Sequence, residues 1–446
     1  MSARPAADEA PIAIIGSGVS GLAAARELMH LGLDATVYES SKQIGGMANT
    51  HRDLDGFIFD TGAHFITNRF ATAIGIAPLC RTVHRYGETV WSDGRAYDYP
   101  FGLMRNPRYL RGAINARIRS KRSVETAADQ FRSEYGSEIA DEVALPLLEQ
   151  WSGLPADRLS PAVADKLPGG ILATLALKLS ARATNRAVAI GYCREAPQSA
   201  NVWHVYPENG IATICAALTT ELADTVQTDS PVERVLTTDG CAVGVVVNGR
   251  EIPAAAVIST LPVPHLAALT DEESLQPFRQ LRYRAMVFVN IMLRGGDVMP
   301  DTLTWTPGVE FPCFRISETT QSMPWLAPTG STIITADLGA LVGDSIWTQD
   351  DQALEEMVLK ALCAIVPSAR RDFLGSRVLR SAFAYPIFDL AYEETRLALG
   401  RGTGIERLLS VGRNGEFAHI LMEDSYWRTL RQVRKLAAQL NEPVQN

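Results

Sequence analysis

Cysteine is scarce in this chain and follows no recognisable pattern. Among 446 residues there are six cysteines, and no two of them form a Cys-x-x-Cys pair or another short metal-ligand spacing. This distribution argues against a disulfide scaffold and against a zinc site, so we expect no bound metal and a reducing, cytoplasmic environment. The six residues are Cys80, Cys193, Cys215, Cys241, Cys313 and Cys363.

Long apolar runs and an excess of positive charge are also missing. No stretch approaches the roughly 20 apolar residues that cross a bilayer, and no basic region precedes an apolar core at the amino terminus. The sequence therefore predicts no membrane span and no signal segment. A net charge of −8 gives no overall field that would attract a polyanion such as DNA or an acidic membrane surface, so nucleic acid is not an expected partner. A local exception, from Arg428 to Lys435, is typical of a solvated helix face.

The segment that begins at Pro11 has the pattern of strand, turn, helix and strand. Ile12–Ile15 is a short, continuously apolar run, as required for a strand buried on both faces. Residues 21–31 then carry apolar side chains at helical spacing, and Ala35–Tyr38 is a second β-rich run. We expect a β-α-β unit at the start of a parallel sheet.

Three glycines in this unit have the spacing Gly-x-Gly-x-x-Gly. Gly16 allows the tight turn, Gly18 lets the backbone approach a diphosphate, and Gly21 lets the helix pack closely on the strand. Glu39 ends the second strand, where its carboxylate can accept hydrogen bonds from ribose hydroxyls and repels a ribose phosphate. The pattern predicts a dinucleotide site for FAD or NAD rather than NADP.

The remaining chain divides into sections with different predicted secondary structure. Residues 76–204 read as a largely helical insert with few strands, and residues 280–340 alternate as antiparallel strands with one covered face do. Asp239-Gly240 and Asn248-Gly249 are hairpin signatures. Further expected elements are strands at Val226–Val235, Ala242–Val247, Ala256–Ser259 and Leu408–Val411, a turn over Gly412–Gly415 and a last helix over Asp424–Leu440.

Four segments resemble a family of flavoproteins that includes protoporphyrinogen oxidase, the flavin amine oxidases and UDP-galactopyranose mutase. Residues 39–68 are similar to the stretch where a Glu, a Gly-Gly pair and an Asp-x-Gly-x-His element follow one another. Residues 131–161 resemble the helical insert, and residues 202–222 resemble the return to the FAD domain. Residues 412–430 resemble the motif that closes over the flavin ring.

The resemblance implies a set of cofactor and substrate residues, with FAD as the cofactor. His64 would lie against the flavin, and its ordinary pKa near 6.5 suits a catalytic proton transfer. Helix amides beginning near Met422 would face the flavin edge that becomes negative on reduction. The residues implied for the cofactor are Gly16, Gly18, Ser20, Gly21, Glu39, Gly45, Gly46, Gly62, Ala63, Val232, Gly412, Arg413 and Met422, and those implied for the substrate are Arg315, Tyr385 and His419.

The implied fold is α/β. It has a Rossmann-like FAD-binding domain and a discontinuous α+β substrate domain, in which an antiparallel sheet carries the helical insert. The FAD domain would contain residues 1–75, 205–265 and 375–446, and the substrate domain residues 76–204 and 266–374.

Departures from the family pattern fall in regions expected to contact the substrate. Met47 stands where amine oxidases carry an arginine after the paired glycines, and Gln150-Trp151-Ser152-Gly153 replaces a Lys-Val-Trp-Gly element. His419 and Leu421 stand where tyrosine and asparagine are common. We therefore expect substrate recognition to have diverged.

Three functions are compatible with this resemblance. The first is an oxidase or desaturase that removes a hydride equivalent from a small organic substrate through flavin N5. The second is a reduced-flavin-dependent nucleotide-sugar mutase, a branch that Asp60 to His64 and Pro100-Phe101 also resemble. The third is a non-enzymatic binding protein of the kind represented by the Rab GDP-dissociation inhibitors. The sequence leaves the substrate, the electron acceptor and the oligomeric state open.

Overall fold

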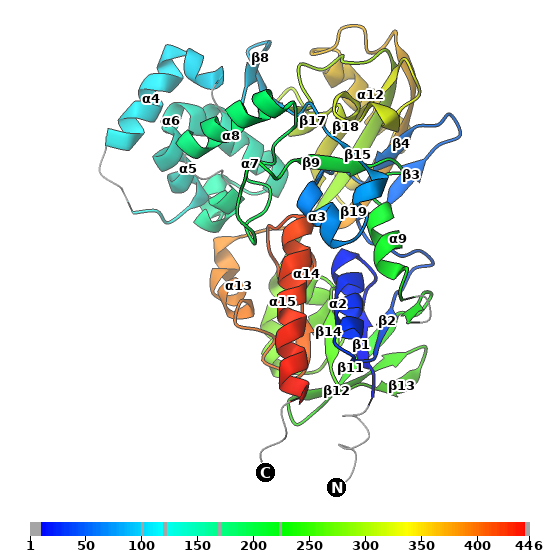
Figure 1. The fold of residues 1–446 in the computed structure, drawn as a ribbon. Helices are drawn as coiled ribbons and strands as arrows, with labels where there is room; N and C mark the ends of the chain where they lie inside the picture. Colours follow the sequence, from blue (N-terminus) through cyan, green and yellow to red (C-terminus); the bar gives the residue numbers. More distant parts are fainter. Residues whose placement is uncertain (1–9, 100–101, 119–122, 167–170, 223–224, 442–446) are drawn as a thin grey trace.

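The computed structural model describes residues 10–99, 102–118, 123–166, 171–222 and 225–441. Two halves lie end to end (Figure 1): the half that contains β1, α2 and α15 holds the first and last described residues, and the other contains a large sheet and a cluster of helices. Pro100 and Phe101, singled out above, lie outside the described residues. No helix in the described part of the chain has the length and apolar character to cross a bilayer.

A five-stranded parallel sheet forms the centre of the first half. β1 and β2 occupy the residues that the sequence predicted, and β1 is buried along its whole length because neighbouring strands and covering layers enclose it. In sheet order the strands are β10 (Val226–Gln227), β2 (Ala35–Tyr38), β1 (Ile12–Ile15), β14 (Val257–Ser259) and β20 (Leu408–Ser410).

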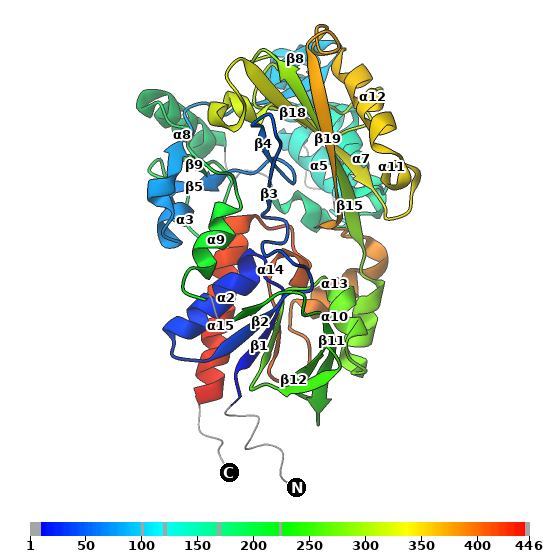
Figure 2. The same ribbon diagram turned by 90° about the vertical axis from the view of Figure 1, so that its right-hand side faces the viewer.

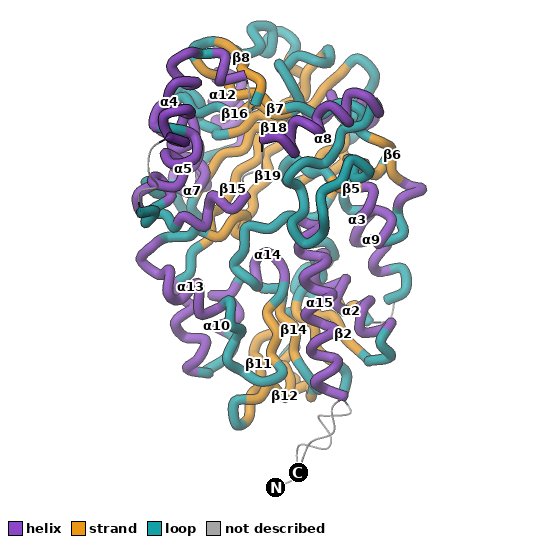
Figure 3. The backbone as a smooth tube through the Cα atoms, turned by 60° about the vertical axis from the view of Figure 1, so that its left-hand side comes forward, coloured by secondary structure: helices purple, strands orange, loops and turns teal. Residues whose placement is uncertain are grey.

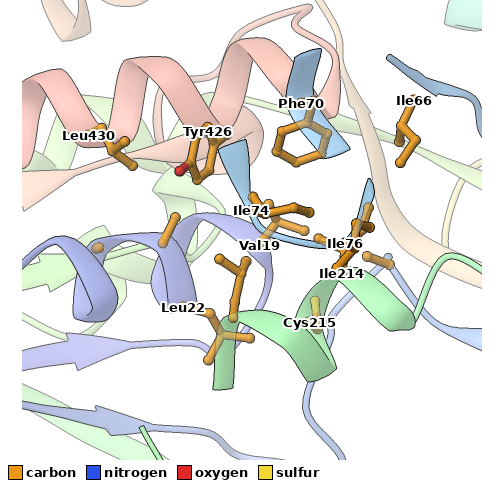
Figure 4. Packing of buried hydrophobic residues seen from close by; sticks show 14 of the residues in the cluster. Val19, Leu22, Ile66, Phe70, Ile74, Ile76, Ile214, Cys215, Tyr426 and Leu430 are labelled. Atoms are coloured by element: carbon orange, nitrogen blue, oxygen red, sulfur yellow. The ribbon is translucent and has the colours of Figure 1, made fainter. Parts of the chain in front are cut away.

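Helices cover one face of this parallel sheet. α2 (Val19–His30) and α15 (Met422–Asn441) pack against each other, with α9 (Thr213–Thr219) beside α2. Figure 4 shows Leu22 of α2 and Tyr426 of α15 among the apolar side chains that meet there. Fully burying an apolar side chain of this size contributes about 1.5–3 kcal/mol, so this contact fixes α2 on the sheet.

A three-stranded antiparallel sheet contributes to the opposite face. Its two hairpins turn where the sequence predicted, and Asp239 and Asn248 both have the positive φ that such turns require. The single strand expected over Val226–Val235 is wrong, because a turn with Asp229 at a φ of 50° and Pro231 divides it. The strands are β11 (Val232–Thr238), β12 (Cys241–Val247) and β13 (Arg250–Pro253).

A seven-stranded mixed sheet forms the second half. Antiparallel pairing of its longest strands confirms the prediction, but the expectation of one covered face is wrong for β15, which is buried on both faces. Val287 and Val289 pack under α12 (Asp351–Leu362), while Met286 and Phe288 belong to a separate apolar cluster on the other face. In sheet order the strands are β19 (Phe373–Pro386), β15 (Tyr283–Arg294), β18 (Ser331–Ala340), β17 (Arg315–Ser317), β16 (Leu303–Trp305), β7 (Glu88–Ser92) and β8 (Arg95–Asp98).

The insert between residues 76 and 204 is helical but also contains strands. The prediction of a largely helical region with few strands is confirmed. Two of these strands, β7 and β8, form a hairpin around Asp93-Gly94 and join the seven-stranded sheet through β16. β6 (Cys80–Thr82) pairs with β9 (His204–Pro207), which also pairs with β5 (Ile66–Thr67). Helices stand beside the large sheet (Figure 3): α4 (Pro107–Ile118), α5 (Ala127–Tyr135), α6 (Ser137–Ile139), α7 (Leu145–Ser152) and α8 (Ile171–Thr184).

Short elements join these layers. Other helices are α3 (Asn68–Ala73), α10 (Val263–Ala268), α11 (Ser345–Thr348), α13 (Glu393–Leu399) and α14 (Gly412–Gly415), and β3 (Thr50–Arg52) pairs with β4 (Ile58–Asp60). The view in Figure 2 places α10 and α13 on the side of the parallel sheet opposite α2. The turn expected over Gly412–Gly415 is the single helical turn α14. The last helix, α15, begins at Met422, two residues before the expected start at Asp424.

The strand β19 bears on the predicted domain boundaries. The boundary at residue 375 falls inside this strand, and its pairing with β15 keeps residues 373–386 in the seven-stranded sheet. We therefore propose that the chain returns to the FAD-binding half after Pro386 rather than at 375. The other boundaries stay predictions.

The basic face of α15 is solvated and also forms ion pairs. Arg428 and Arg431 form ion pairs with Glu195, and Arg434 forms one with Glu27 of α2. These contacts tie α15 to two other segments, while Arg431 and Arg434 stay 55% and 61% exposed, in agreement with the expected solvated face.

Candidate functional site

The glycine turn after β1 is tightly constrained by its neighbours. Gly16 has a φ of 99°, and a Cβ there would lie 2.3 Å from Oγ1 of Thr260. A Cβ on Gly21 would lie 1.9 Å from the carbonyl oxygen of Gly16, which is a collision. Both positions therefore require glycine for the close packing of α2 against β1.

Gly18 is different because its side-chain direction is open. It is the N-cap of α2 with an extended backbone, its φ is −72°, and no described atom lies within 4 Å of an added Cβ. No side chain caps α2, and its first turn carries no acidic residue. The helix amino terminus thus offers unpaired amides and partial positive charge toward open space, as an anion site requires.

A second glycine pair lies against this turn. Gly45 forms a parallel bridge with Gly18 and donates its amide to the carbonyl oxygen of Ser17 at 3.0 Å. A Cβ on Gly46 would lie 3.5 Å from Cα of Gly18, and its φ of 56° also favours glycine. The two glycine segments therefore form opposite sides of one narrow backbone cradle.

Glu39 connects the end of β2 to the glycine turn. Its Oε2 accepts hydrogen bonds from the amide of Ser17 at 3.0 Å and from the Ser17 hydroxyl at 2.8 Å, and its Oε1 accepts one from the amide of Ser41 at 2.9 Å. Burial alone would raise the pKa of this carboxyl, but the hydrogen bonds from Ser17 and Ser41 offset burial and lower it. Glu39 is therefore held ionised beside the cradle.

His64 is partly buried near a second carboxyl group. Its Nδ1 is 4.0 Å from Oδ2 of Asp60 and has no hydrogen-bond partner among the described atoms. Burial, with the positive charges of Arg413 and Arg315, lowers the pKa of His64 to about 4. Burial also raises the pKa of Asp60 to about 6, against hydrogen bonds from Tyr206 and Thr50 that favour its ionised form.

The lowered pKa alters the expectation for His64. A neutral imidazole can donate or accept a hydrogen bond at neutral pH, but it is a poor proton acceptor when its pKa is about 4. Arginine charges close to this ring were not visible from the local sequence. We therefore propose a positioning role for His64, in place of the proton transfer that its ordinary pKa suggested.

The His64 ring signal is expected to stay in its neutral position between about pH 5 and 8, where a free histidine titrates. Because the unfolded chain takes up this proton near pH 6.5 and the folded chain only near pH 4, the group costs stability progressively as the pH falls between these values. NMR of ¹³C-histidine protein, with the signal assigned by His64→Gln, measures this directly. A titration midpoint between pH 6 and 7 would overturn it.

The carboxy-terminal segment closes against the same cradle. Gly412 has a φ of 80°, and a Cβ there would lie 2.5 Å from the Ser20 hydroxyl on α2. The Arg413 guanidinium carbon lies 4.3 Å from the centre of the Tyr385 ring, while its buried Nε has no partner in the part of the chain that the structure describes. α15 begins at Met422, as the resemblance implied.

One cavity of about 760 Å³ joins these segments to the second half of the molecule. Its lining includes Gly16 and Gly18 at one end and apolar residues of the insert, among them Phe131 and Leu147, at the other. All the predicted site residues except Gly21 and Val232 line it: Gly16, Gly18, Ser20, Glu39, Gly45, Gly46, Gly62, Ala63, His64, Arg315, Tyr385, Gly412, Arg413, His419 and Met422. Gly21 does not line the cavity; it packs against the carbonyl oxygen of Gly16 and so supports the turn.

Val232 lies at the start of β11 and does not line this cavity. Its segment nevertheless lies close to the cradle, because the amide of Ser230 donates to the carbonyl oxygen of Glu39 at 2.8 Å. A contact between Val232 and an adenine ring stays a prediction.

Arg315 lines the cavity and forms an ion pair with Asp337. Its Nε lies 2.9 Å from Oδ2 of Asp337, whose side chain is fully buried and whose Oδ1 has no described partner. Burial alone would lower the pKa of the Arg315 guanidinium, but the Asp337 carboxylate raises it above its ordinary value. The guanidinium also lies over Trp305, 5.7 Å from the ring centre.

Tyr385 and His419 share an aromatic wall with Trp151. Trp151 contacts the edges of both rings, with centres 5.2 Å from Tyr385 and 4.8 Å from His419. His419 also stacks on Phe388 and bonds through Nε2 to the carbonyl oxygen of Pro386 at 2.7 Å. His419 is therefore held by its surroundings as a fixed part of the wall.

Several cavity residues were missed by sequence reasoning. Glu88 on β7 accepts hydrogen bonds from the Tyr86 hydroxyl at 2.6 Å and from Nε1 of Trp305 at 2.9 Å. Tyr135 and Phe131 reach the cavity from α5. No local motif marks these residues, because they meet only once β7 joins the large sheet and the helices pack over it.

Among the described side chains, no group of three or more histidine, cysteine, aspartate or glutamate residues is arranged to hold a metal ion. None of the six cysteines, which all lie in the described part of the chain, takes part in a disulfide bond.

The family model described as flavin containing amine oxidoreductase matches residues 19–412. The chain belongs to this family. FAD is therefore its cofactor, and the α/β fold inferred from the sequence agrees with the solved structures of relatives. The glycine cradle, the open space at Gly18 and the ionised Glu39 fit the ADP half of this group. Arg413, whose Nε has no partner among the described residues, lines the same cavity.

Similar proteins agree on the fold and differ in activity. Protoporphyrinogen oxidase 2, chloroplastic/mitochondrial, of Arabidopsis thaliana is 26% identical over 173 residues, which make up 33% of this chain and 34% of that protein. The match thus spans about a third of that relative's length. A crystal structure of reduced UDP-galactopyranose mutase has a TM-score of 0.77 at 17% identity, covering 97% of this chain and 96% of that chain. A putative protoporphyrinogen oxidase from Exiguobacterium sp. 255-15 has a TM-score of 0.72 at 16% identity, covering 96% and 99%.

Proposed function

We propose that this protein is an FAD-dependent oxidase or desaturase that removes a hydride equivalent from an apolar small molecule, such as an amine, a ring system or a polyene. The observation that carries this proposal is that the glycine cradle and the apolar wall of the insert line one continuous cavity. A cofactor gripped at one end would meet a substrate enclosed at the other, with no second site required.

The residues of the chain would act mainly by positioning and by excluding water. Aromatic side chains such as Trp151 and Tyr385 support one another and give the cavity fixed walls, which orients a bound carbon skeleton. FAD, when bound, would supply the acceptor for the hydride equivalent at N5 and pass the electrons to oxygen or another acceptor. Neutral His64, whose Nδ1 has no partner among the described residues, would offer a hydrogen bond to a bound group.

Polar groups on the wall would select the orientation of the substrate. Glu88 is held between Tyr86 and Trp305, and Arg315 is held by Asp337 beside the same tryptophan. This places the carboxylate of Glu88 and the Arg315–Asp337 ion pair near Trp305, where a polar end of the substrate would be bound. We propose Arg315, Tyr385 and His419 as substrate-binding residues on this basis.

The two alternative functions have less support. A nucleotide sugar is strongly polar, whereas the insert end of the cavity is lined by residues such as Phe131, Ile139 and Leu147. Fold similarity to a mutase does not distinguish these chemistries. A binding protein without cofactor would have no need for the open, uncapped helix terminus at Gly18.

Anaerobic mixing of the FAD-loaded protein with candidate substrates tests the proposal. We expect apolar amines, partly saturated rings or polyenes to bleach the flavin absorption band, with one flavin reduced per substrate oxidised. Ala144→Trp, which fills the insert end of the cavity, is expected to slow this bleaching by at least about tenfold without changing FAD content.

Two results would overturn the assignment. Turnover of UDP-galactopyranose only after chemical reduction of the flavin, with no net electron transfer, would favour the mutase. Failure of the purified protein to retain FAD under any condition would favour a binding protein.

A further inference from the structure

The outer side of α4 carries an exposed apolar stripe. Leu110, Ile114 and Ile118 follow one another at intervals of four residues and are 45%, 49% and 77% exposed. Residues at this spacing lie on one face of a helix. Figures 1 and 3 both place α4 at the outer edge of the helical insert. The stripe is therefore a continuous apolar surface at the periphery of the molecule.

The inner side of α4 already has its packing partners. Tyr109 is buried and its hydroxyl donates to Oε2 of Glu142 at 2.8 Å, and Gly112 packs so closely that a Cβ would lie 2.0 Å from Oε2 of Glu138. Since this face holds the helix in the insert, the stripe on the other face is not required for folding.

Arginines border the stripe on both sides. At 100° per residue, Arg117 falls beside Leu110 at one edge and Arg111 falls beside Ile118 at the other. Both arginines are exposed, and neither forms an ion pair with a described residue. A helix with an apolar stripe between two cationic edges has the form of helices that lie in the interface of a lipid bilayer.

The charge of this segment opposes that of the whole chain. Residues 105–118 contain four arginines and no acidic residue, although the protein carries a net charge of −8. Arg108 and Arg105 are paired with Glu142 and Asp98, which leaves Arg111 and Arg117 as free positive charges. The sequence continues with Arg119, Lys121 and Arg122, outside the described residues.

We infer that the outer face of α4, defined by Leu110, Arg111, Ile114, Arg117 and Ile118, docks on an anionic lipid bilayer. The apolar stripe would enter the boundary between headgroups and acyl chains, and the arginines would contact anionic headgroups. A second copy of the chain would bring like charges together, which opposes dimerisation through this face. A nucleic acid offers phosphates but no apolar layer for the isoleucines.

The location suggests a use for such docking. The 3₁₀ turn Gly102–Arg105 directly precedes α4, and Leu103 and Met104 in this turn line the large cavity. If the substrate is apolar, as the proposed function holds, it would partition into the bilayer that α4 contacts. Bilayer binding itself does not depend on that function.

Co-sedimentation of the FAD-loaded protein with vesicles tests the inference. We expect binding to phosphatidylcholine vesicles that contain phosphatidylglycerol, weak binding to pure phosphatidylcholine, and loss of binding as salt is added. Arg111→Glu with Arg117→Glu is expected to weaken binding by at least about tenfold, since each basic residue near an anionic surface contributes roughly fivefold. Ile114→Glu with Ile118→Glu should have an effect of similar size.

A control double variant distinguishes binding through this surface from nonspecific binding to vesicles. Leu341→Glu with Val342→Glu changes two exposed apolar residues after β18 and should leave vesicle binding unchanged. All variants should keep the thermal stability and FAD content of the parent, because the changed side chains are exposed. Equal binding to both vesicle types, or binding that survives both α4 double variants, would overturn the inference. Stripe-dependent dimers without lipid, or oligonucleotide binding that needs the arginines but not the isoleucines, would do so too.

Discussion

Gly18→Asp is expected to abolish FAD binding while the apoprotein stays folded. An aspartate fits sterically, since no described atom lies within 4 Å of the added Cβ and the φ of Gly18 is −72°. As an N-cap, aspartate is at least as favourable as glycine, so apoprotein stability should be unchanged or slightly higher. Its carboxylate, however, would occupy the space and oppose the charge of the FAD diphosphate. A like-charge pair at about 4 Å costs several kcal/mol at an effective dielectric constant near 20, so the FAD Kd should rise by at least about 100-fold.

Calorimetric titration of apoprotein with FAD, together with thermal unfolding of the same samples, measures both quantities. Gly296→Asp is the matched control, because that glycine is exposed in the loop after β15, has open space around its Cβ and does not line the cavity. Tight FAD binding by Gly18→Asp would refute the placement of the diphosphate. Unfolding of the apoprotein would show that Gly18 has a structural role instead.

Asp337→Ala is expected to destabilise the protein by about 3–5 kcal/mol, because it leaves the Arg315 charge buried without its partner. Asp337 is fully buried and its bond to Arg315 is the ion pair that neutralises this part of the cavity wall. Chemical denaturation of the apoprotein gives the free energy of unfolding for the parent and the variant.

The double variant Arg315→Met with Asp337→Leu provides the control. Replacing both partners with apolar side chains of similar volume often leaves stability unchanged, so most of the loss should be recovered. A double variant as unstable as Asp337→Ala would contradict the ion-pair explanation and point to packing. If the double variant folds and binds FAD, a rise in KM with FAD content unchanged would support Arg315 as a substrate-binding residue.

The parts of the fold that the sequence predicted are those encoded by neighbouring residues. β1 and β2 came from short apolar runs, and the two hairpins came from Asp239-Gly240 and Asn248-Gly249. The glycine turn could be predicted because Gly16 and Gly21 each meet a local steric demand, as the 1.9 Å approach of a Cβ on Gly21 to the carbonyl oxygen of Gly16 illustrates.

The parts that were missed depend on contacts between distant segments. β15 reads as a strand with one covered face, yet α12 covers one side and an apolar cluster the other. The pairing of Arg315 with Asp337 follows from the register of β17 and β18. The pKa of His64 is set by burial and by arginines far along the chain, so the ordinary value was the wrong guide.

We propose that FAD and an apolar substrate share one cavity, with the cofactor at the glycine cradle and the substrate at the insert. Measuring bound FAD, and the shift of the flavin absorption band on adding an apolar ligand, in the same samples tests this arrangement. We expect the parent to hold one FAD per chain and to show a saturable shift, Gly18→Asp to hold no FAD, and Ala144→Trp to hold FAD but show no shift. An unchanged shift in Ala144→Trp, or full FAD content in Gly18→Asp, would contradict the claim.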